Sequence, residues 1–582
     1  MAKTLRQQPK ITVVLMMLRF AYWSLILLCI APILPGLVGV LISALGYLPA
    51  LGHHQPSWLG FSQVWQWQGV EYALLLSVSS TLISTYLALL ISFAILQRFW
   101  FHPRWKRIEN SLSMLIALPH VAFAIGFAFL FSSTGWLARL LHSLFEYQDP
   151  SQDVAWLVHD PYAIGLTLGL AFKEVPFILL ISLPILQQFN LPKMQMLSAS
   201  LGYSEQQMWW KIIFPQWLRK IRFTLFAVAA YAISVVDFSL VLGPTTPPTF
   251  SVLVWQWFNE PDLSLLPRAA SGAVVLLLLA SIILLVIRIF EWLITQGCRN
   301  WQSSGRYSPP LPHKTLLGLL FVISVSIIPL TLVWSVAQRW RFPDLFPSQW
   351  TVQFWGDEWP NVLVNIETSV LLALCSGTLA LLFAVIAQEY RLQTKRAIPV
   401  YFIALPMLLP QLSLLFGIQV LTLMIASQAY ALWVVWAHTF FAFPLVYLAL
   451  SGPWQSYNPN YSKVARSLGK NEWQIFWRVK LPLLFPALLY AWAVGISVSL
   501  AQYLPTLMLG SGRLTTITTE AVALSSGYDR RVTAIYAICQ AILPFVFFSF
   551  ALLLGRVQVH RYRVAQFKVV FHGIFSRKPR HP

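Results

Sequence analysis

The chain has 582 residues, of which 57% are hydrophobic and 10% are charged. Soluble globular proteins carry about a quarter charged residues, so this composition excludes an ordinary soluble enzyme. The abundance of aliphatic and aromatic side chains also excludes a disordered chain. The formal net charge is nevertheless +20. Because the basic residues alternate with long apolar runs, this charge indicates a membrane protein and not a protein that binds nucleic acid.

Apolar runs of about 20 residues, the length of a membrane-spanning helix, recur along the whole chain. Twelve such runs are present, in two sets of six. The first set lies near 17–47, 71–97, 111–134, 161–188, 223–243 and 269–290. The second set lies near 315–336, 361–387, 398–424, 430–451, 484–509 and 533–555. We therefore predict an all-α polytopic membrane protein with about 12 transmembrane helices in two homologous six-helix halves.

The distribution of basic residues predicts the orientation of these spans. When the spans alternate across the bilayer, 32 of the 40 Lys and Arg residues fall on one side. Basic residues are enriched in cytoplasmic loops, so this side and both termini are predicted to be cytoplasmic. The opposite loops are acidic overall.

The two halves resemble each other in sequence. Gly202, Pro215 and Gly243 of the first half match Gly469, Pro482 and Gly510 of the second, all at an offset of 267 residues. Because six spans is an even number, both copies enter from the same side and form a parallel repeat. We predict a first six-span domain at 1–295, a polar linker at 296–314, a second six-span domain at 315–556 and a basic cytoplasmic tail at 557–582.

Two matching cytoplasmic loops carry the most specific motif. The loops read MLSASLGYSEQQMWWKIIFP, from Met196, and KVARSLGKNEWQIFWRVKLP, from Lys463. In both, Ser-Leu-Gly precedes a proline by thirteen positions, and a β-branched residue stands three positions before that proline. This spacing predicts a short helix, a turn at the glycine and a second helix. The aromatic residues give the loops an apolar face that is typical of docking helices.

These loops resemble the EAA loop of permease subunits of bacterial ABC importers, whose pattern is roughly E-A-A-x3-G-x9-I-x-L-P. The start of the pattern differs here, because Met196–Leu197–Ser198 and Lys463–Val464–Ala465 replace Glu-Ala-Ala almost entirely. The resemblance extends over nearly the whole chain and includes its duplication, as in the fused permeases of the thiamine and ferric-iron branch. A segment from Ala437 to Pro444 is also similar to that branch.

The resemblance implies a multi-pass location in the bacterial inner (cytoplasmic) membrane. It implies that the loops at 192–220 and 459–482 are coupling helices that dock on two copies of a separate ATPase subunit. It also implies a periplasmic substrate-binding protein at the outer face, surrounding lipid, and no nucleic acid. The chain itself would bind no cofactor and no metal and would catalyse no reaction, since ATP is used by the partner subunit. The coupling residues that it implies are Ser200, Leu201, Gly202, Ile212, Pro215, Ala465, Ser467, Leu468, Gly469, Val479, Leu481 and Pro482.

Charged residues within the predicted spans are the candidates for the translocation pathway. Lys173 and Glu174 lie in the fourth span and Asp237 lies in the fifth. A charge at mid-bilayer costs about 2.5–3.5 kcal/mol on insertion scales, so such residues face a partner or a water path. One hypothesis pairs Lys173 with Asp237 and leaves Glu174 toward the pathway. The alternative is an ion pair that only fixes helix packing.

Gln411 and Gln502 are further pathway candidates, although polar residues in bundles often only join helices. Acids from one half alone would suit a cationic solute, for which thiamine is the family-level expectation, followed by ferric iron and polyamines. A second hypothesis is a twelve-span secondary transporter driven by an ion gradient, in which the two matched loops have no role. A membrane-embedded enzyme is the least favoured, because the sequence shows no catalytic constellation.

Overall fold

The computed structural model describes residues 8–49, 55–109, 118–145, 157–395, 399–425, 428–527 and 529–575. These residues form helices and one small two-stranded antiparallel sheet. Ten of the described helices are long and apolar enough to cross a membrane, or eleven if one bent pair is counted as a span. The chain is therefore an all-helical protein with many spans, as the hydropathy of the sequence predicts.

The described part of the first half, up to Ser303, consists of helices. Its elements are α2 (Gln8–Cys29), α3 (Ile33–Ala44), α4 (Leu59–Gln66), α5 (Val70–Phe99), α7 (His120–Phe131), α8 (Trp136–Phe145), α9 (Ile164–Gln187), α10 (Leu191–Ser200), α11 (Glu205–Met208), η2 (Trp209–Ile213), α12 (Phe214–Ser234), α13 (Asp237–Leu242), α14 (Phe250–Phe258), η3 (Leu263–Leu265), α15 (Leu266–Trp292), η4 (Leu293–Gly297) and α16 (Arg299–Ser303).

The second half repeats much of this order. Its elements are α17 (His313–Ser335), β1 (Ala337–Arg339), β2 (Gln349–Trp350), α18 (Gln353–Thr394), α19 (Val400–Leu408), α20 (Gln411–Ile425), α21 (Tyr430–Gln455), α22 (Pro459–Ser467), α23 (Glu472–Ile475), η5 (Phe476–Lys480), α24 (Leu481–Leu500), α25 (Leu504–Gly510), α26 (Ile517–Ser525) and α27 (Arg530–Phe575).

The predicted runs at 398–424 and 223–243 differ from single apolar helices in the described part of the chain. The run at 398–424 is a broken pair, in which Tyr401–Leu408 and Gln411–Thr422 meet at an angle of 95°. The run at 223–243 is divided between α12 and α13. Helix α12 contains three basic residues, Arg219, Lys220 and Arg222. The hydropathy of α12 is therefore lower than that of the other spans.

The repeat is visible in equivalent hydrogen bonds as well as in sequence. The Ser77 hydroxyl on α5 accepts a hydrogen bond from the backbone N–H of Phe250 at 2.7 Å, at the start of α14. The Ser369 hydroxyl on α18 accepts one from the N–H of Ile517 at 2.9 Å, at the start of α26. Since the first N–H groups of a helix have no partner within it, the same buried serine satisfies the same helix end in both halves.

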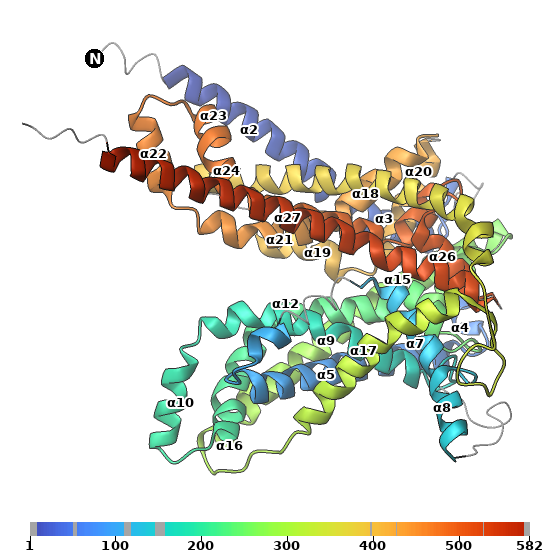
Figure 1. Ribbon diagram of the computed structural model, residues 1–582. Helices are drawn as coiled ribbons and strands as arrows, with labels where there is room; N and C mark the ends of the chain where they lie inside the picture. Colours follow the sequence, from blue (N-terminus) through green and yellow to red (C-terminus); the bar gives the residue numbers. More distant parts are fainter. Residues whose placement is uncertain are drawn as a thin grey trace, which may run out of the picture.

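The first helix of each half packs against helices of the other half. Helix α2 lies along α18 and α21, while α17 lies beside α5 and α7 (Figure 1). The rings of Tyr22 on α2 and Tyr390 on α18 are stacked, with centroids 3.9 Å apart. The Trp436 indole of α21 also donates a hydrogen bond to the Leu28 carbonyl at 3.0 Å. The halves are therefore interlocked in space rather than side by side in chain order.

Buried contacts at the outer end of the molecule also join the halves. Arg139 on α8 is 2% exposed and donates hydrogen bonds to the carbonyls of Arg341 and Asp344, beyond β1, at 2.8 and 2.7 Å. Arg530, at the start of α27, donates in return to the Thr134 hydroxyl at 2.8 Å. These hydrogen bonds from two arginines fix the position of the two halves relative to each other at this end.

Candidate coupling loops and interior polar cluster

Both predicted coupling loops are built as a helix, a glycine turn and a second helix. Helix α10 ends at Ser200, and Gly202 follows it with a φ of 75°. Helix α22 ends at Ser467, and Gly469 has a φ of 78°. A residue with a Cβ is strained in this left-handed region, which explains why glycine stands at both turns.

The second helix of each loop starts with the same capping arrangement. Ser204 caps α11, and its partner Gln207 bonds back to the Ser204 N–H. Asn471 caps α23, and Gln474 does the same for the Asn471 N–H. Such a capping box satisfies two N–H groups that the helix leaves unpaired. It fixes the direction in which each loop turns back toward the membrane.

A π-helical turn follows in both loops before the next span begins. It covers Trp209–Ile213 in the first loop and Phe476–Lys480 in the second, an offset of 267 residues. Pro215 and Pro482 then lie in the first turn of α12 and α24, where a missing N–H costs nothing. The loops therefore pass without interruption into the long helices that carry Asp237 and Gln502 just beyond their far ends.

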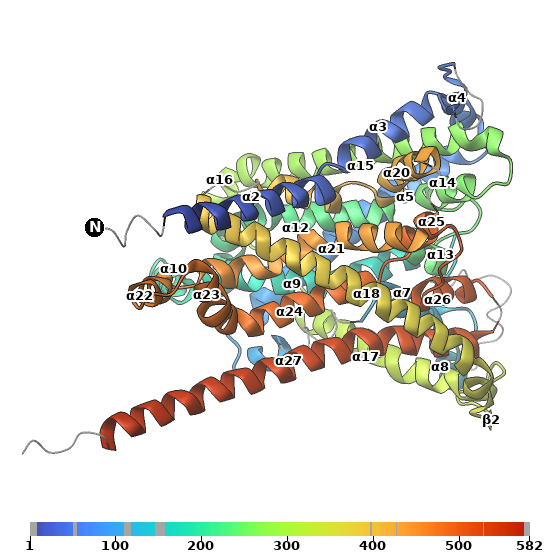
Figure 2. The same ribbon diagram turned by 90° about the horizontal axis from the view of Figure 1, so that it is seen from above.

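The two loops lie at the same end of the molecule as the start of α2 and the end of α27 (Figures 1 and 2). This end is cytoplasmic by the distribution of basic residues. Leu201 and Leu468, which precede the two glycines, are 69% and 73% exposed. Large apolar side chains so exposed on a polar surface are typical of protein contact sites.

The remaining predicted coupling residues divide between the surface and the base of the loops. The hydroxyls of Ser200 and Ser467 bond to carbonyls three residues earlier, at 2.8 and 2.7 Å. Ala465 and Pro215 are buried, Ile212 is exposed, and Val479, Leu481 and Pro482 are partly exposed. The exposed members surround each turn, whereas the buried ones hold it to the bundle.

The first loop is held by the linker between the halves, which sequence reasoning did not connect with it. The Lys211 ammonium donates hydrogen bonds to the carbonyls of Trp301 and Ser304 at 2.6 and 2.8 Å. Gln206 and Trp210 both donate to the Pro309 carbonyl, at 2.8 and 2.9 Å. The acceptors are backbone carbonyls, which every residue has, so no residue pattern indicates these contacts.

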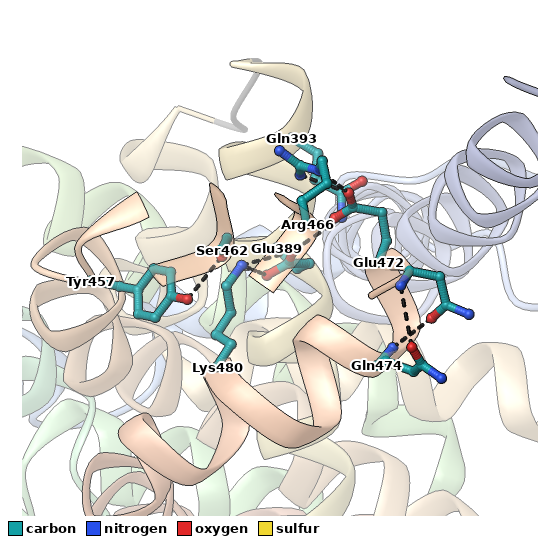
Figure 3. Close-up of polar contacts among 9 residues, drawn as sticks. Glu389, Gln393, Tyr457, Ser462, Arg466, Glu472, Gln474 and Lys480 are labelled. Atoms are coloured by element: carbon teal, nitrogen blue, oxygen red, sulfur yellow. Dashed lines mark hydrogen bonds and ion pairs between the residues drawn. The ribbon is translucent and has the colours of Figure 1, made fainter. Parts of the chain in front are cut away.

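The second loop is held by ion pairs instead (Figure 3). The Lys480 ammonium lies 2.9 and 2.8 Å from the two carboxylate oxygens of Glu389 on α18. Arg466 on α22 pairs with Glu472 on α23 at 2.6 Å, across the glycine turn. The Lys480–Glu389 pair is nearly buried, with side chains 9% and 12% exposed. Lys480 belongs to the predicted loop at 459–482, and nothing in the sequence pattern indicates Glu389 as its partner.

The interior candidates of the first half form a polar cluster within the helix bundle. The Lys173 ammonium on α9 donates to the Leu118 carbonyl at 2.5 Å. Glu174 lies 3.2 Å from His120 Nε2, at the start of α7. The His120 ring in turn packs against Tyr231 of α12, with centroids 4.7 Å apart. The predicted pairing of Lys173 with Asp237 stays a prediction.

Asp237 brings this cluster to the boundary between the halves. It is the first residue of α13, a short helix that packs against α7 and α9 of the first half and against α26 of the second. The position that matches Asp237 in the second half is Leu504, which likewise begins a short helix, α25. The two breaks are thus equivalent in backbone but not in charge. Of these two matched positions, only the one in the first half carries a carboxylate.

The two glutamine candidates lie at breaks in the second half. Gln502 is buried between α24 and α25, and its amide donates to the His438 carbonyl at 3.3 Å. Gln411 is the first residue of α20, directly after the bend at Pro410. Within the described ranges, no group of three or more His, Cys, Asp and Glu side chains is arranged to hold a metal ion.

Comparison with known proteins identifies the family. Residues 380–563 match the model of the binding-protein-dependent transport system inner membrane component. The chain is 32% identical over 545 residues to the inner membrane ABC transporter permease protein YnjC of Escherichia coli (strain K12), covering 92% of this chain and 96% of that protein.

Two further relatives share less of the sequence. The thiamine transport system permease protein ThiP of Haemophilus influenzae is 21% identical over 510 residues, covering 85% of this chain and 89% of that protein. A putative 2-aminoethylphosphonate transport system permease protein, PhnV of Salmonella typhimurium, is 27% identical over 241 residues, or 40% of this chain and 86% of that protein. With its many spans and full-length likeness to the Escherichia coli protein, the chain belongs to the inner membrane permease subunits of binding-protein-dependent ABC transporters.

Proposed function

We propose that this permease imports a small cationic solute, for which a thiamine-like compound is the first candidate and ferric iron or a polyamine the next. The observation that carries the proposal is the interior cluster of Glu174, which lies 3.2 Å from His120, and Asp237 at the start of α13, with the Tyr231 ring packed against His120. Carboxylates attract a cation, and aromatic faces stabilise an organic cation further. The full-length likeness to a thiamine permease supports the same class of solute.

The energy would come from two ATPase subunits, one at each of the loops 192–220 and 459–482. Equivalent glycine turns, capping boxes and π-helical turns support equal roles for the two loops. The exposed Leu201 and Leu468 give each loop an apolar contact for the ATPase. A binding protein would deliver the solute at the opposite, outer end.

The loops are connected to the interior cluster by rigid helices, which suggests how the ATPase would drive transport. Helix α12 begins next to the first loop and ends at Ser234, three residues before Asp237. Helix α24 begins next to the second loop and ends at Leu500, two residues before Gln502. At 1.5 Å per residue, such helices reach about 30 Å. Closing of the ATPase pair would therefore tilt both helices and open the cluster to the outside.

Identification of the solute tests the proposal directly. The binding protein that works with this permease would be purified without denaturation, and its bound solute identified by mass spectrometry. Proteoliposomes that contain the permease and its ATPase would then be assayed for uptake of that solute. ATP-dependent uptake of an organic cation is the expected result. An anionic or uncharged solute would contradict the proposed solute class, while leaving the coupling loops unaffected.

A further inference from the structure

A cavity of about 500 Å³ lies between the two halves at the outer end of the molecule. The first half contributes the turn before α8 and α8 itself, and the second half contributes the end of α17, β1 and the start of α27. These elements meet at the end opposite the coupling loops (Figure 2). Binding pockets for small molecules measure about 300–1,000 Å³, so the cavity has the size of a ligand site.

Arginines dominate the charge of this cavity. Its lining contains five of them: Arg139, Arg339, Arg341, Arg530 and Arg531. Among the described residues that line it, the single carboxylate is that of Asp529, which pairs with Arg531 at 2.8 Å. The other four arginines therefore have no carboxylate in the cavity wall to balance them. Because the loops at this end are acidic overall, the cavity is a local concentration of positive charge in acidic surroundings.

Two of these arginines, one from each half, are held close together. Arg139 Nε and Arg530 Nη1 both donate a hydrogen bond to the Thr134 carbonyl, at 3.1 and 3.3 Å. Both guanidinium groups also lie over the Trp334 ring, 5.9 and 5.3 Å from its centroid. A carbonyl and an aromatic ring satisfy a guanidinium group without cancelling its charge. A positive potential is therefore built into the cavity by the fold.

Arg339 and Arg341 provide donors that are available to a ligand. Both side chains are exposed, and within the described part of the chain neither guanidinium group makes a hydrogen bond or an ion pair. Trp340 and Phe342, which are partly buried, add an aromatic wall to the same cavity. Guanidinium forks match the oxygens of a phosphate group, which has enough oxygens to engage several arginines at once. The aromatic wall suits an organic group attached to that phosphate.

We infer that this arginine cavity, lined by Arg139, Arg339, Arg341, Arg530 and Arg531, binds a phosphate group that carries an organic substituent. Two sources share this chemistry, the headgroup of an anionic phospholipid and a free organic phosphate on the outer side. The ligand would reduce the repulsion between arginines of the two halves and so join the halves at this end.

The arginine cavity is distinct from the interior cluster to which the proposed function assigns the imported solute. Neither Glu174 nor Asp237 lines it. Its positive charge would also repel a cationic solute. The inference therefore does not rest on the proposed function, and either can fail without the other.

Binding measurements on the complete permease test the inference. Glycerol 3-phosphate is the probe for a free organic phosphate, with uncharged glycerol as its control, and isothermal titration calorimetry gives the affinity. Phosphatidylglycerol is the probe for a lipid headgroup, with zwitterionic phosphatidylcholine as its control, and native mass spectrometry detects the retained lipid. Preferential binding of either probe supports the inference and identifies the source. If neither probe bound better than its control, the inference would be overturned.

Substitutions distinguish the arginine cavity from other surfaces that attract anions. Arg339→Gln/Arg341→Gln removes two exposed guanidinium groups that hold no other described residue, so this double variant is expected to fold normally. Its affinity for the bound probe should fall at least about tenfold, because each lost hydrogen bond between charged groups weakens binding by about that factor or more. Arg513→Gln is the matched control, because Arg513 is an exposed arginine that does not line the cavity. Equal affinities of the two variants would contradict the inference.

A ligand that joins the halves should also stabilise the folded permease. Because a ligand that binds only the folded state raises the unfolding midpoint, the bound probe is expected to raise the midpoint of the wild type and of Arg513→Gln. The double variant should show a smaller rise at the same probe concentration. A rise of equal size in all three proteins would locate the bound anion elsewhere on the molecule and overturn the inference.

Discussion

The Lys480 ammonium and the Glu389 carboxylate form a nearly buried ion pair, with nitrogen–oxygen distances of 2.8 and 2.9 Å, beneath the second coupling loop. Glu389 lies near the end of the long helix α18, and Lys480 is the last residue of the π-helical turn that leads into α24. The pair therefore fixes the base of the loop to a membrane-spanning helix. In the first half, Gln97 of α5 bonds to the Gln206 carbonyl at 3.5 Å, a weaker attachment of the first loop.

Loss of one partner of this ion pair is expected to destabilise the permease. Lys480→Met leaves the Glu389 carboxylate without its ammonium in a nearly buried place, which costs about 3–5 kcal/mol. The double variant Lys480→Met/Glu389→Met should recover most of this loss, because it leaves no unpaired charge. Thermal unfolding midpoints in detergent check both variants. A single variant as stable as the wild type would show that the pair contributes nothing to the loop.

The glycine turn of the second loop predicts a selective effect on ATPase docking. Gly469 has a φ of 78°, and a Cβ added to it would meet no other atom within 4 Å. The Cβ of Gly469→Val therefore meets no clash, and the expected cost is backbone strain, about 1–2 kcal/mol for a side chain in the left-handed region. We expect this variant to reorient the loop and to lose ATPase in co-purification.

Gly469→Asn is the control for the same turn, because asparagine tolerates the left-handed conformation better than other side chains with a Cβ. It should retain the ATPase. If Gly469→Val retained as much ATPase as Gly469→Asn, the geometry of the turn would not matter for docking.

The features that sequence predicted best depend on spacing along one segment. The Gly202-to-Pro215 and Gly469-to-Pro482 spacings indicated a helix, a turn and a second helix, because glycine and proline restrict the backbone wherever they stand. The spans followed from hydropathy in the same way. The break in the fifth span, between the end of α12 at Ser234 and the start of α13 at Asp237, was not predicted, because the sequence around it is largely apolar apart from Asp237 itself.

Contacts between distant segments could not be predicted from sequence alone. Helix α2 lies along α18 rather than only among helices of its own half, and an apolar helix surface does not specify which apolar neighbour it meets in a bilayer. The linker binds the first loop through carbonyls such as that of Pro309. The partner of Lys480 was hidden for a related reason, since Glu389 is 91 residues away in the chain.

Substitution of the interior acids is expected to reduce transport without affecting assembly with the ATPase. Glu174→Gln and Asp237→Asn remove the negative charges of the cluster while they retain its size, so a cationic solute loses its electrostatic attraction. We expect uptake by proteoliposomes to fall at least tenfold in each variant, with ATPase association unchanged. Glu71→Gln is the control, because Glu71 is an exposed acid in the first turn of α5. A lower unfolding temperature with normal uptake would instead support a purely structural role for the acids.

Helices α3 and α20 bring the backbones of the two halves so close together that even a glycine-to-alanine substitution is expected to have a large effect. Helix α3 crosses α20 at Gly39 and Gly417, and a Cβ at Gly417 would lie 1.7 Å from the Gly36 carbonyl oxygen. Backbones that pack so closely exclude even a methyl group, as is common where small residues join membrane helices. Gly417→Ala is therefore expected to force the helices apart, at a cost of about 1–3 kcal/mol.

The measurement for this contact is the thermal unfolding midpoint of Gly417→Ala compared with Gly318→Ala. Gly318 lies within α17, and a Cβ there would meet no atom within 4 Å, so alanine should leave stability unchanged or raise it through its better helix propensity. The Gly417 variant should unfold at a lower temperature. Because α3 belongs to the first half and α20 to the second, the loss should also weaken the association of the halves when they are expressed as two chains. Equal stability of the two alanine variants would mean that the halves are not held together by this crossing.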